Sequence, residues 1–245
     1  MPAATSEPKA DVSVIVPVWR DTEAVRNLLE NAQRWRPPPR EIVVVSAEAD
    51  AELAALCAAH GHRCLADGAP NRGAQLDLGA RNAAGSILWF LHADSTAPDN
   101  GVEAILRAVE DGAESGCFTF AFHGERTWYK RLIERGVAAR LRLGGIAYGD
   151  QALFVTRDAY AACGGFPHEP LFEEVRLVKR LRRRGTFRIL SERVGVSTRR
   201  WERDGWLRRT AQNRWLAFRY ALGAPPARLA AAYSRVRVRT DRPSA

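Results

Sequence analysis

Short and nearly uninterrupted apolar runs set the strongest limit on how this chain can fold. They occupy residues 12–17, 42–45 and 87–91, and the last of them, ILWFL, is the most apolar. Runs of this kind are typical of strands that are buried on both faces of a parallel sheet. Segments with helical spacing separate them. The alternation predicts βαβ units, and therefore an α/β fold with a mostly parallel central sheet flanked by helices.

The remaining pattern predicts further elements and three regions. Proline cannot donate to a strand ladder, so we expect Pro17 to end the first strand. Beyond residue 100 we expect strands at 117–122 and 152–156, and helices at 102–110, 128–143, 158–163 and 174–184. A chain of 245 residues suits one main domain. We therefore expect a flexible N-terminus (1–10), an α/β domain (11–200) and a basic helical C-terminal extension (201–245).

Composition excludes several classes of protein. The first ten residues lack the apolar core of a signal peptide, and no run approaches the roughly 18 apolar residues of a membrane-spanning helix. We therefore expect a cytoplasmic protein. The four cysteines show no C-x-x-C spacing, which argues against a zinc site or a disulfide framework.

The net positive charge of the chain is confined to the tail. Residues 199–245 contain twelve arginines against three acidic residues, which gives the whole formal net charge of +9. Residues 1–198 are therefore neutral as a block. A neutral core does not favour polyanions, so we expect no nucleic-acid partner.

Polar residues follow the expected strands, where open α/β sheets bind their ligands. Pro17 and Trp19 come at the end of the first strand, and His92 and Asp94 follow the ILWFL strand. A carboxylate in that place suits Mg²⁺ or Mn²⁺ held against phosphate oxygens, since hard cations prefer oxygen ligands. The alternative is that Asp94 only caps a helix.

Three other motifs carry polar groups. Arg72 and Gly73 precede a helix, where an arginine meets a phosphate or is simply solvated. Asp150 and Gln151 precede a strand. Glu173 and Glu174 begin a helix that ends in basic residues, so they either cap the helix dipole or supply a general base.

The order of these motifs resembles the family 2 glycosyltransferases of GT-A fold. The matching pieces are SVIVPVWRD, EIVVV, RGAQ followed by ARNAAGSILWFLHAD, GDQALFV, and GGFP followed by FEEVRLVKRLRRRG. Together they cover roughly residues 12–200. Within the family, the RGAQ, FLHAD and GDQ motifs are similar to those of a small bacterial subgroup assigned to arsenosugar biosynthesis.

The resemblance implies a Rossmann-like GT-A domain and an inverting, hexosyltransferase-like enzyme. Its donor would be a nucleotide-diphosphate sugar, most simply a UDP-sugar, and its acceptor an unknown small molecule or lipid. Asp94 would be the ligand of Mg²⁺ or Mn²⁺ and of the diphosphate. Glu174 would be the catalytic base, with Glu173 or Asp150 as substitutes. The remaining nucleotide-sugar-binding residues would be Pro17, Trp19, Glu48, Arg72, Gln75, His92 and Gln151.

Two positions depart from the family pattern. The second strand of the family usually ends in an acid that meets the nucleobase, whereas this chain has Ser46 there. The contact is then lost or moved to Glu48 or Asp50. The base position usually holds aspartate after glutamate. Glu174 keeps the carboxylate but places it one methylene further out, which matters for catalytic geometry.

The basic, aromatic segment 199–222 has two interpretations. Apolar residues spread over more than one stripe at helical spacing, since Leu207, Ala211, Trp215 and Phe218 form one set, and Trp206, Leu216 and Tyr220 recur with Arg209 and Asn213 in another. Such a helix either packs on the domain with its arginines outside, or lies on an anionic membrane surface. The second interpretation would make the protein peripheral at the inner face of the membrane.

Other functions remain as alternatives. A nicotinamide dehydrogenase would need G-x-G-x-x-G after the first strand, and a nucleotidyltransferase a glycine-rich basic loop there. The chain has neither. A catalytically degenerate nucleotide-binding protein stays open because of Ser46 and Glu174. A basic-tailed protein that binds nucleic acid or a partner through residues 199–245 also stays open.

Overall fold

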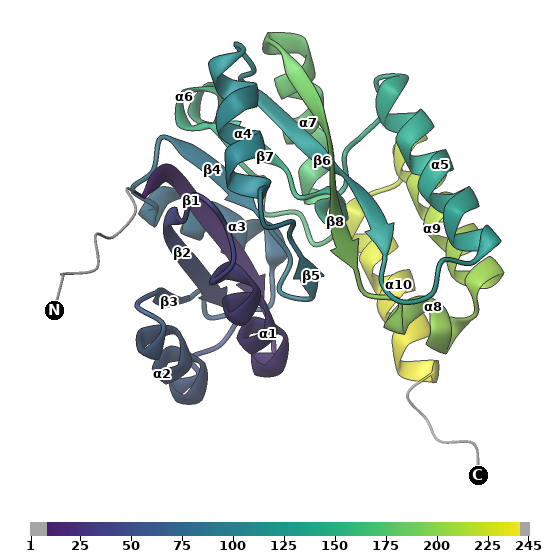
Figure 1. The fold of residues 1–245 in the computed structure, drawn as a ribbon. Helices are drawn as coiled ribbons and strands as arrows, with labels where there is room; N and C mark the ends of the chain where they lie inside the picture. Colours follow the sequence, from purple (N-terminus) through teal and green to yellow (C-terminus); the bar gives the residue numbers. More distant parts are fainter. Residues whose placement is uncertain (1–8, 241–245) are drawn as a thin grey trace, which may run out of the picture.

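The apolar runs of the sequence form the centre of one eight-stranded sheet in the described part of the chain (Figure 1). The computed structural model describes residues 9–240, with side chains through Tyr233. The order of the strands is β3-β2-β1-β4-β7-β6-β8-β5. Their bounds are β1 (Ala10–Val18), β2 (Pro39–Ser46), β3 (Arg63–Ala66), β4 (Ile87–Phe90), β5 (Ser95–Thr96), β6 (Ser115–Phe122), β7 (Phe154–Thr156) and β8 (Phe187–Val196).

The sheet is parallel in its first half and mixed in its second. Strands β1, β2, β3 and β4 pair in parallel, as the apolar runs predicted. In contrast, β7 runs antiparallel to both β4 and β6, and β5 runs antiparallel to β8. The predicted α/β architecture is thus confirmed, with a short reversed strand in the middle of the sheet.

Pro17 does not end β1, contrary to the expectation, because the strand continues to Val18. Strand β4 pairs with β1 only from Val12 to Ile15. At Pro17, β1 is therefore paired on the β2 side alone. The missing backbone N–H of a proline is tolerated at a position where the neighbouring strand on one side has already ended.

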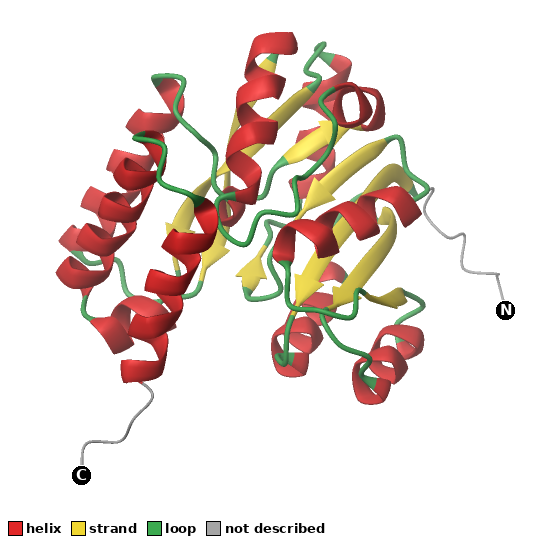
Figure 2. Cartoon of the chain, turned by 180° about the vertical axis from the view of Figure 1, so that it is seen from behind, coloured by secondary structure: helices red, strands yellow, loops and turns green. Residues whose placement is uncertain are grey.

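Helices cover both faces of the sheet (Figure 2). Helices α1 (Thr22–Ala32), α2 (Ala51–Ala59) and α4 (Gly101–Glu110) share one apolar core with the sheet. On the other face lie α3 (Arg72–Asn82), α6 (Arg157–Ala162) and α7 (Glu173–Arg184), and the end of α5 (Trp128–Arg142). Strand β1 serves both cores, since Val14 and Val16 belong to the first and Ile15 to the second. This alternation explains why the run is apolar throughout.

Strand β8 was not expected from the sequence. It pairs in parallel with β6 over residues 187–196, and the register shifts between Phe118 and Thr119. The shift lies opposite the polar stretch Ser191-Glu192 of β8, and Thr119 Oγ1 donates to both carbonyls of that stretch. This polar stretch interrupts the alternation of apolar residues, so the strand could not be predicted from the sequence pattern.

Three helices follow β8, namely α8 (Arg199–Asp204), α9 (Trp206–Ala221) and α10 (Pro226–Thr240). The ring of Trp206 lies 4.8 Å from that of Tyr129 on α5 and 5.1 Å from that of Phe122 on β6. The segment therefore packs on the rest of the chain, although a domain boundary at 201 stays a prediction. No helix among the described residues is long and apolar enough to cross a bilayer.

Candidate functional site

Two predicted residues meet at the carboxyl ends of β1 and β2. The indole Nε1 of Trp19 donates to Glu48 Oε1 at 3.3 Å, and Arg20 forms an ion pair with the same carboxylate at 3.0 Å. Asp50, the other candidate acid, caps helix α2 by accepting from the backbone N–H of Leu53. Glu48 is therefore the acid that is placed beside Trp19.

Gln75 holds the ends of the same two strands together. Its side-chain Nε2 donates to the carbonyl of Val18 at 2.9 Å and to that of Val45 at 2.7 Å. The side chain is buried. Both of its amide hydrogens are used in this way, so its contribution to a ligand site is to fix the rim formed by Pro17, Val18 and Val45.

Asp94 lies in the turn between β4 and β5 and is half-buried. Among the described residues, none donates a hydrogen bond to its carboxylate or pairs with it. The described part of the chain also holds no cluster of three or more His, Cys, Asp or Glu side chains arranged for a metal. Asp94 is thus a partly exposed carboxylate that a cation could take as its one protein ligand, with phosphate and water as the others.

Arg72 and Glu173 join the first turns of α3 and α7. The Arg72 Nε donates to Glu173 Oε1 in a close ion pair. Glu173 is almost fully buried, while 37% of the Arg72 side chain stays exposed. Burial alone would raise the pKa of Glu173, but the guanidinium overcomes it and holds that pKa below its usual value. Glu173 is therefore an anion that anchors Arg72.

The two helices can approach closely because residue 73 is glycine. A Cβ at Gly73 would lie 2.3 Å from the carbonyl oxygen of Pro167. This glycine admits the loop before α7, so its role in the described structure is to allow packing.

Glu174 has the environment of a general base. Its Oε1 accepts from the backbone N–H of Gly149 at 3.2 Å, and its Oε2 is buried without a hydrogen-bond partner among the described residues. Burial and the negative charge of Glu173 together raise the pKa of Glu174 to about 8. A carboxylate with such a pKa is a proton acceptor matched to neutral conditions.

His92 lies against Gly149, so it adjoins the same cluster. A Cβ at Gly149 would be 2.5 Å from the His92 Nε2, and only glycine permits this approach. Burial, followed by the positive charges of Arg72 and Arg200, lowers the pKa of His92 to about 3. The imidazole is therefore neutral at physiological pH.

Asp150 and Gln151 form the 3₁₀ turn η1 (Gly149–Gln151) beside Glu174. The Gln151 Oε1 accepts from Arg140 at 2.9 Å and from the backbone N–H of Tyr148 at 2.9 Å, and its Nε2 donates to Asp150. Burial raises the pKa of Asp150, against the opposing influence of Arg140 and Arg72. Gln151 thus orients Asp150, the second carboxyl of the cluster with a raised pKa.

Backbone strain gathers next to these residues. Three non-glycine residues of the described chain have positive φ, namely Arg20 (53°), Ala152 (44°) and Phe172 (62°). They directly adjoin Trp19, Gln151 and Glu173 respectively. Left-handed backbone is costly for such residues and tends to occur at functional sites.

The C-terminal helices bring two arginines that sequence reasoning did not assign to the site. Tyr233 on α10 accepts from Arg209 of α9 and, at 3.5 Å, from Arg200 of α8. Burial would raise the pKa of Tyr233, but these arginines and Arg72 lower it. The positive charge of Arg200 also contributes to lowering the pKa of His92 and opposes the effect of burial on the pKa of Asp150. The composition of the tail does not reveal that these helices fold back onto the site.

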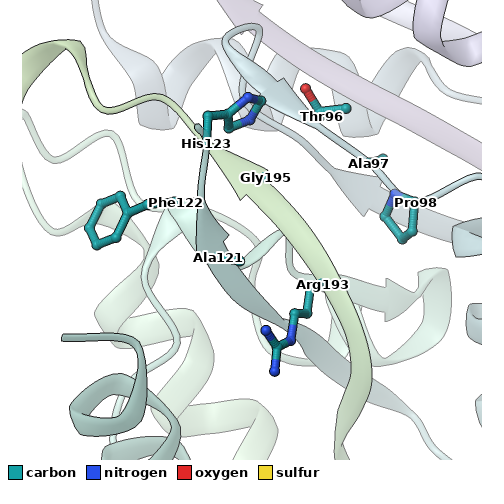
Figure 3. Close-up of a pocket in the computed structure, with 8 residues that line it drawn as sticks. All are labelled: Thr96, Ala97, Pro98, Ala121, Phe122, His123, Arg193 and Gly195. Carbon is teal, nitrogen blue, oxygen red and sulfur yellow. The ribbon is translucent and has the colours of Figure 1, made fainter. Parts of the chain in front are cut away.

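A separate open pocket of about 300 Å³ lies between β5 and the ends of β6 and β8 (Figure 3). His123 and Arg193 provide its charged or titratable groups, and the rest of its lining is largely apolar. None of the predicted site residues lines it. The pocket is thus distinct from the cluster around Glu174.

Comparison with known proteins identifies the family and the fold of this chain. A sequence model described as glycosyl transferase family 2 matches residues 13–172, which is well over half of the chain. No curated protein matches the sequence at a significant level. The matched region contains every predicted site residue except Glu173 and Glu174, which follow it directly.

Solved structures show the same fold at low sequence identity. Mannosyltransferase PcManGT from Pyrobaculum calidifontis, solved with GDP-Man and Mn²⁺, has a TM-score of 0.65, 17% identity, and alignment over 92% of this chain and 68% of its own. S. aureus TarS has a TM-score of 0.61 and 13% identity over 76% of this chain and 36% of its own. TarS 1-349 with UDP has a TM-score of 0.58 and 14% identity over 76% of this chain and 60% of its own. This chain thus spans about a third of TarS. The likeness confirms the predicted GT-A fold.

Proposed function

This chain belongs to glycosyl transferase family 2, and from that membership and the geometry of its site we propose that it transfers a sugar from a nucleotide-diphosphate donor to an acceptor. The observation that carries the proposal is the pairing of two adjacent glutamates in different states. Glu173 is fixed as an anion by Arg72, while burial and the charge of Glu173 raise the pKa of Glu174 to about 8.

The rim at β1 and β2 supports a nucleotide-binding role. Trp19 is 41% exposed and would offer an aromatic surface, and Glu48 beside it would offer a carboxylate to a base or ribose. Glu48 would then make the nucleobase contact that an acid makes in the family from the position held here by Ser46. We propose UDP as the nucleotide, in line with the UDP complex of TarS 1-349, although PcManGT was solved with GDP-Man.

The diphosphate would lie between this rim and Glu174. Arg72 keeps both terminal nitrogens without a partner among the described residues, and Arg200 places a second positive charge close to His92. Asp94 would hold a divalent cation, Mg²⁺ or Mn²⁺. Such a cation, when bound, neutralises the negative charge that develops on the leaving nucleoside diphosphate.

Glu174 would remove the proton from an acceptor hydroxyl as that oxygen attacks the anomeric carbon. The bond from the anomeric carbon to the diphosphate oxygen breaks, its electron pair leaves with the nucleoside diphosphate, and the proton ends on Glu174. A single displacement of this kind inverts the anomeric configuration. Asp150, held by Gln151, would orient the acceptor or replace Glu174 as base.

The acceptor and the location complete the proposal. We propose a cytoplasmic enzyme with a small-molecule or lipid acceptor, peripheral to an anionic membrane through residues 199–222. Assignment to the arsenosugar subgroup is part of the proposal and rests on the RGAQ, FLHAD and GDQ motifs alone.

Release of nucleoside diphosphate from a panel of nucleotide sugars, with Mn²⁺ present and water as the acceptor, tests the function. The wild type should release it from one donor class, and Glu174→Gln should lower kcat by about 10²- to 10⁴-fold. Glu114→Gln changes a carboxylate remote from the site and serves as the control. Binding of a nucleotide without any turnover would instead identify a degenerate, nucleotide-binding protein.

A further inference from the structure

Two helices expose matching apolar stripes. On α9 the stripe is Leu207, Ala211, Trp215, Phe218 and Leu222, and on α5 it is Trp128, Leu132, Gly136, Ala139 and Leu143. Both follow the same spacing of four, four, three and four residues, which places each set on one face of a helix. The large apolar members are between 55 and 88% exposed.

The stripes lie on neighbouring helices. Helices α5 and α9 run side by side at one end of the molecule (Figures 1 and 2). Their first turns touch, since the rings of Tyr129 and Trp206 are 4.8 Å apart. We call the ten stripe residues, with the arginines that flank them, the α5–α9 surface. Exposed apolar area of this extent usually marks an interaction site.

Arginines border both stripes. Arg208, Arg214 and Arg219 flank the α9 stripe on its two sides, and Arg131, Arg135 and Arg142 run along one edge of the α5 stripe. All six are exposed, and no carboxylate in the described part of the chain forms an ion pair with any of them.

Acidic groups are nearly missing from these helices. Helix α9 (Trp206–Ala221) contains no acidic residue. The single acid of α5, Glu134, accepts from the backbone N–H of Phe122 and pairs with Arg126. A second copy docked on the same surface would therefore set arginines against arginines, which opposes self-association.

We propose that the α5–α9 surface binds the headgroup region of an anionic lipid bilayer. Tryptophan, phenylalanine and leucine side chains would enter the acyl boundary, while the arginines would reach lipid phosphates along their apolar stems. A nucleic acid would satisfy the arginines but would leave the apolar stripes in water. The sequence had singled out residues 199–222 alone, and α5 supplies the second half of the surface.

The opposite side of α9 faces the candidate site. The ring of Tyr220 lies 4.9 Å from that of Phe172, the residue before Glu173. A bound bilayer would therefore lie about one helix diameter, roughly 10 Å, from Phe172 next to Glu173. This placement suits an acceptor that is itself in the membrane, a consequence that rests on the proposed function. The docking itself rests on the two stripes and their arginines, and not on the catalytic part of that proposal.

Flotation of the full chain with vesicles tests the proposal. The wild type should float with vesicles of phosphatidylcholine and phosphatidylglycerol, should stay unbound to phosphatidylcholine alone, and should dissociate as salt is raised. Trp215→Ser/Phe218→Ser and Trp128→Ser/Leu132→Ser should each weaken partitioning by about tenfold or more, since each removes two inserted apolar side chains. Wild-type protein that does not bind anionic vesicles would overturn the proposal.

Charge is tested with a matched pair of variants. Arg214→Glu/Arg219→Glu should abolish flotation, whereas Arg183→Glu/Arg188→Glu, which changes the net charge equally outside the surface, should retain it. An equal loss in both would show non-specific attraction and overturn the assignment. Sedimentation must show a monomer, because an oligomer that Trp215→Ser/Phe218→Ser dissociates would assign the surface to a second copy. Donor hydrolysis in the absence of vesicles should be unchanged in these variants, and its failure in the wild type would affect the proposed function without affecting the flotation result.

Discussion

Arg72 and Glu173, 101 residues apart in the chain, form an ion pair that ties the first turn of α3 to the first turn of α7. The pair fixes one of two adjacent glutamates as an anion. Its negative charge then adds to burial in raising the pKa of the other, Glu174. The ion pair is thus the feature that separates the roles of the two carboxylates.

The first prediction concerns the pH dependence of turnover. If Glu174 is the base, kcat/KM of donor hydrolysis should rise with pH through an apparent pKa near 8. Glu173→Gln removes the neighbouring negative charge, so the pKa of Glu174 should fall and the rising limb should move to lower pH. A limb that stays in place in Glu173→Gln would show that Glu174 does not control it.

The second prediction concerns stability. The pKa of Glu174 rises from 4.5 to about 8 on folding, so the folded chain loses stability as pH increases between these values. Glu174→Gln cannot ionise and should gain on the order of a few kcal/mol over the wild type by pH 8.5, with little gain near pH 4.5. Urea unfolding at both pH values measures the difference, with exposed Glu23→Gln as control. An equal effect at both values would contradict the raised pKa.

Arg200 provides the third prediction, as a site residue contributed by the tail. Arg200→Ala should weaken nucleoside diphosphate binding by about tenfold or more, because a charged hydrogen bond to phosphate is lost. Arg199→Ala removes the same charge from the adjacent exposed position and should bind normally. Titration calorimetry compares the two variants, and equal affinities would remove Arg200 from the site.

The fourth prediction compares two helical glycines. Gly73→Ala should destabilise the fold by about 1–3 kcal/mol, because its Cβ would meet the carbonyl of Pro167 at 2.3 Å. Gly136→Ala on α5 has nothing within 4 Å and should stabilise by about 0.5–1 kcal/mol. Thermal unfolding measures both. Similar effects at the two positions would contradict the close contact of α3 with the loop before α7.

The fold was predictable where strands are apolar throughout, as in β1 and β4. Strand β8 was not, because Ser191-Glu192 interrupts its alternation at the point where the register with β6 shifts. Pro17 was misread because local sequence does not tell how far the neighbouring strand β4 extends.

The places of candidate residues in the fold were predictable where residues end a strand or begin a helix, as with Asp94 and Glu174, while their roles stay predictions. Sequence could not show that Arg72 pairs with Glu173, since that contact depends on how α3 and α7 pack. The positions of Arg200 and Tyr233 depend on the tail folding back, which no local pattern encodes.

The most direct test of the account is the thermal stability of the wild type and of Asp94→Ala with UDP, GDP, CDP and dTDP, each with and without Mn²⁺. A ligand at 100 times its dissociation constant should stabilise the fold by about 2.7 kcal/mol, which shifts the midpoint measurably. The account predicts a shift with UDP that requires Mn²⁺ and disappears in Asp94→Ala. If no nucleotide shifts the midpoint of the wild type, or if Asp94→Ala responds as the wild type does, the proposed donor site is wrong.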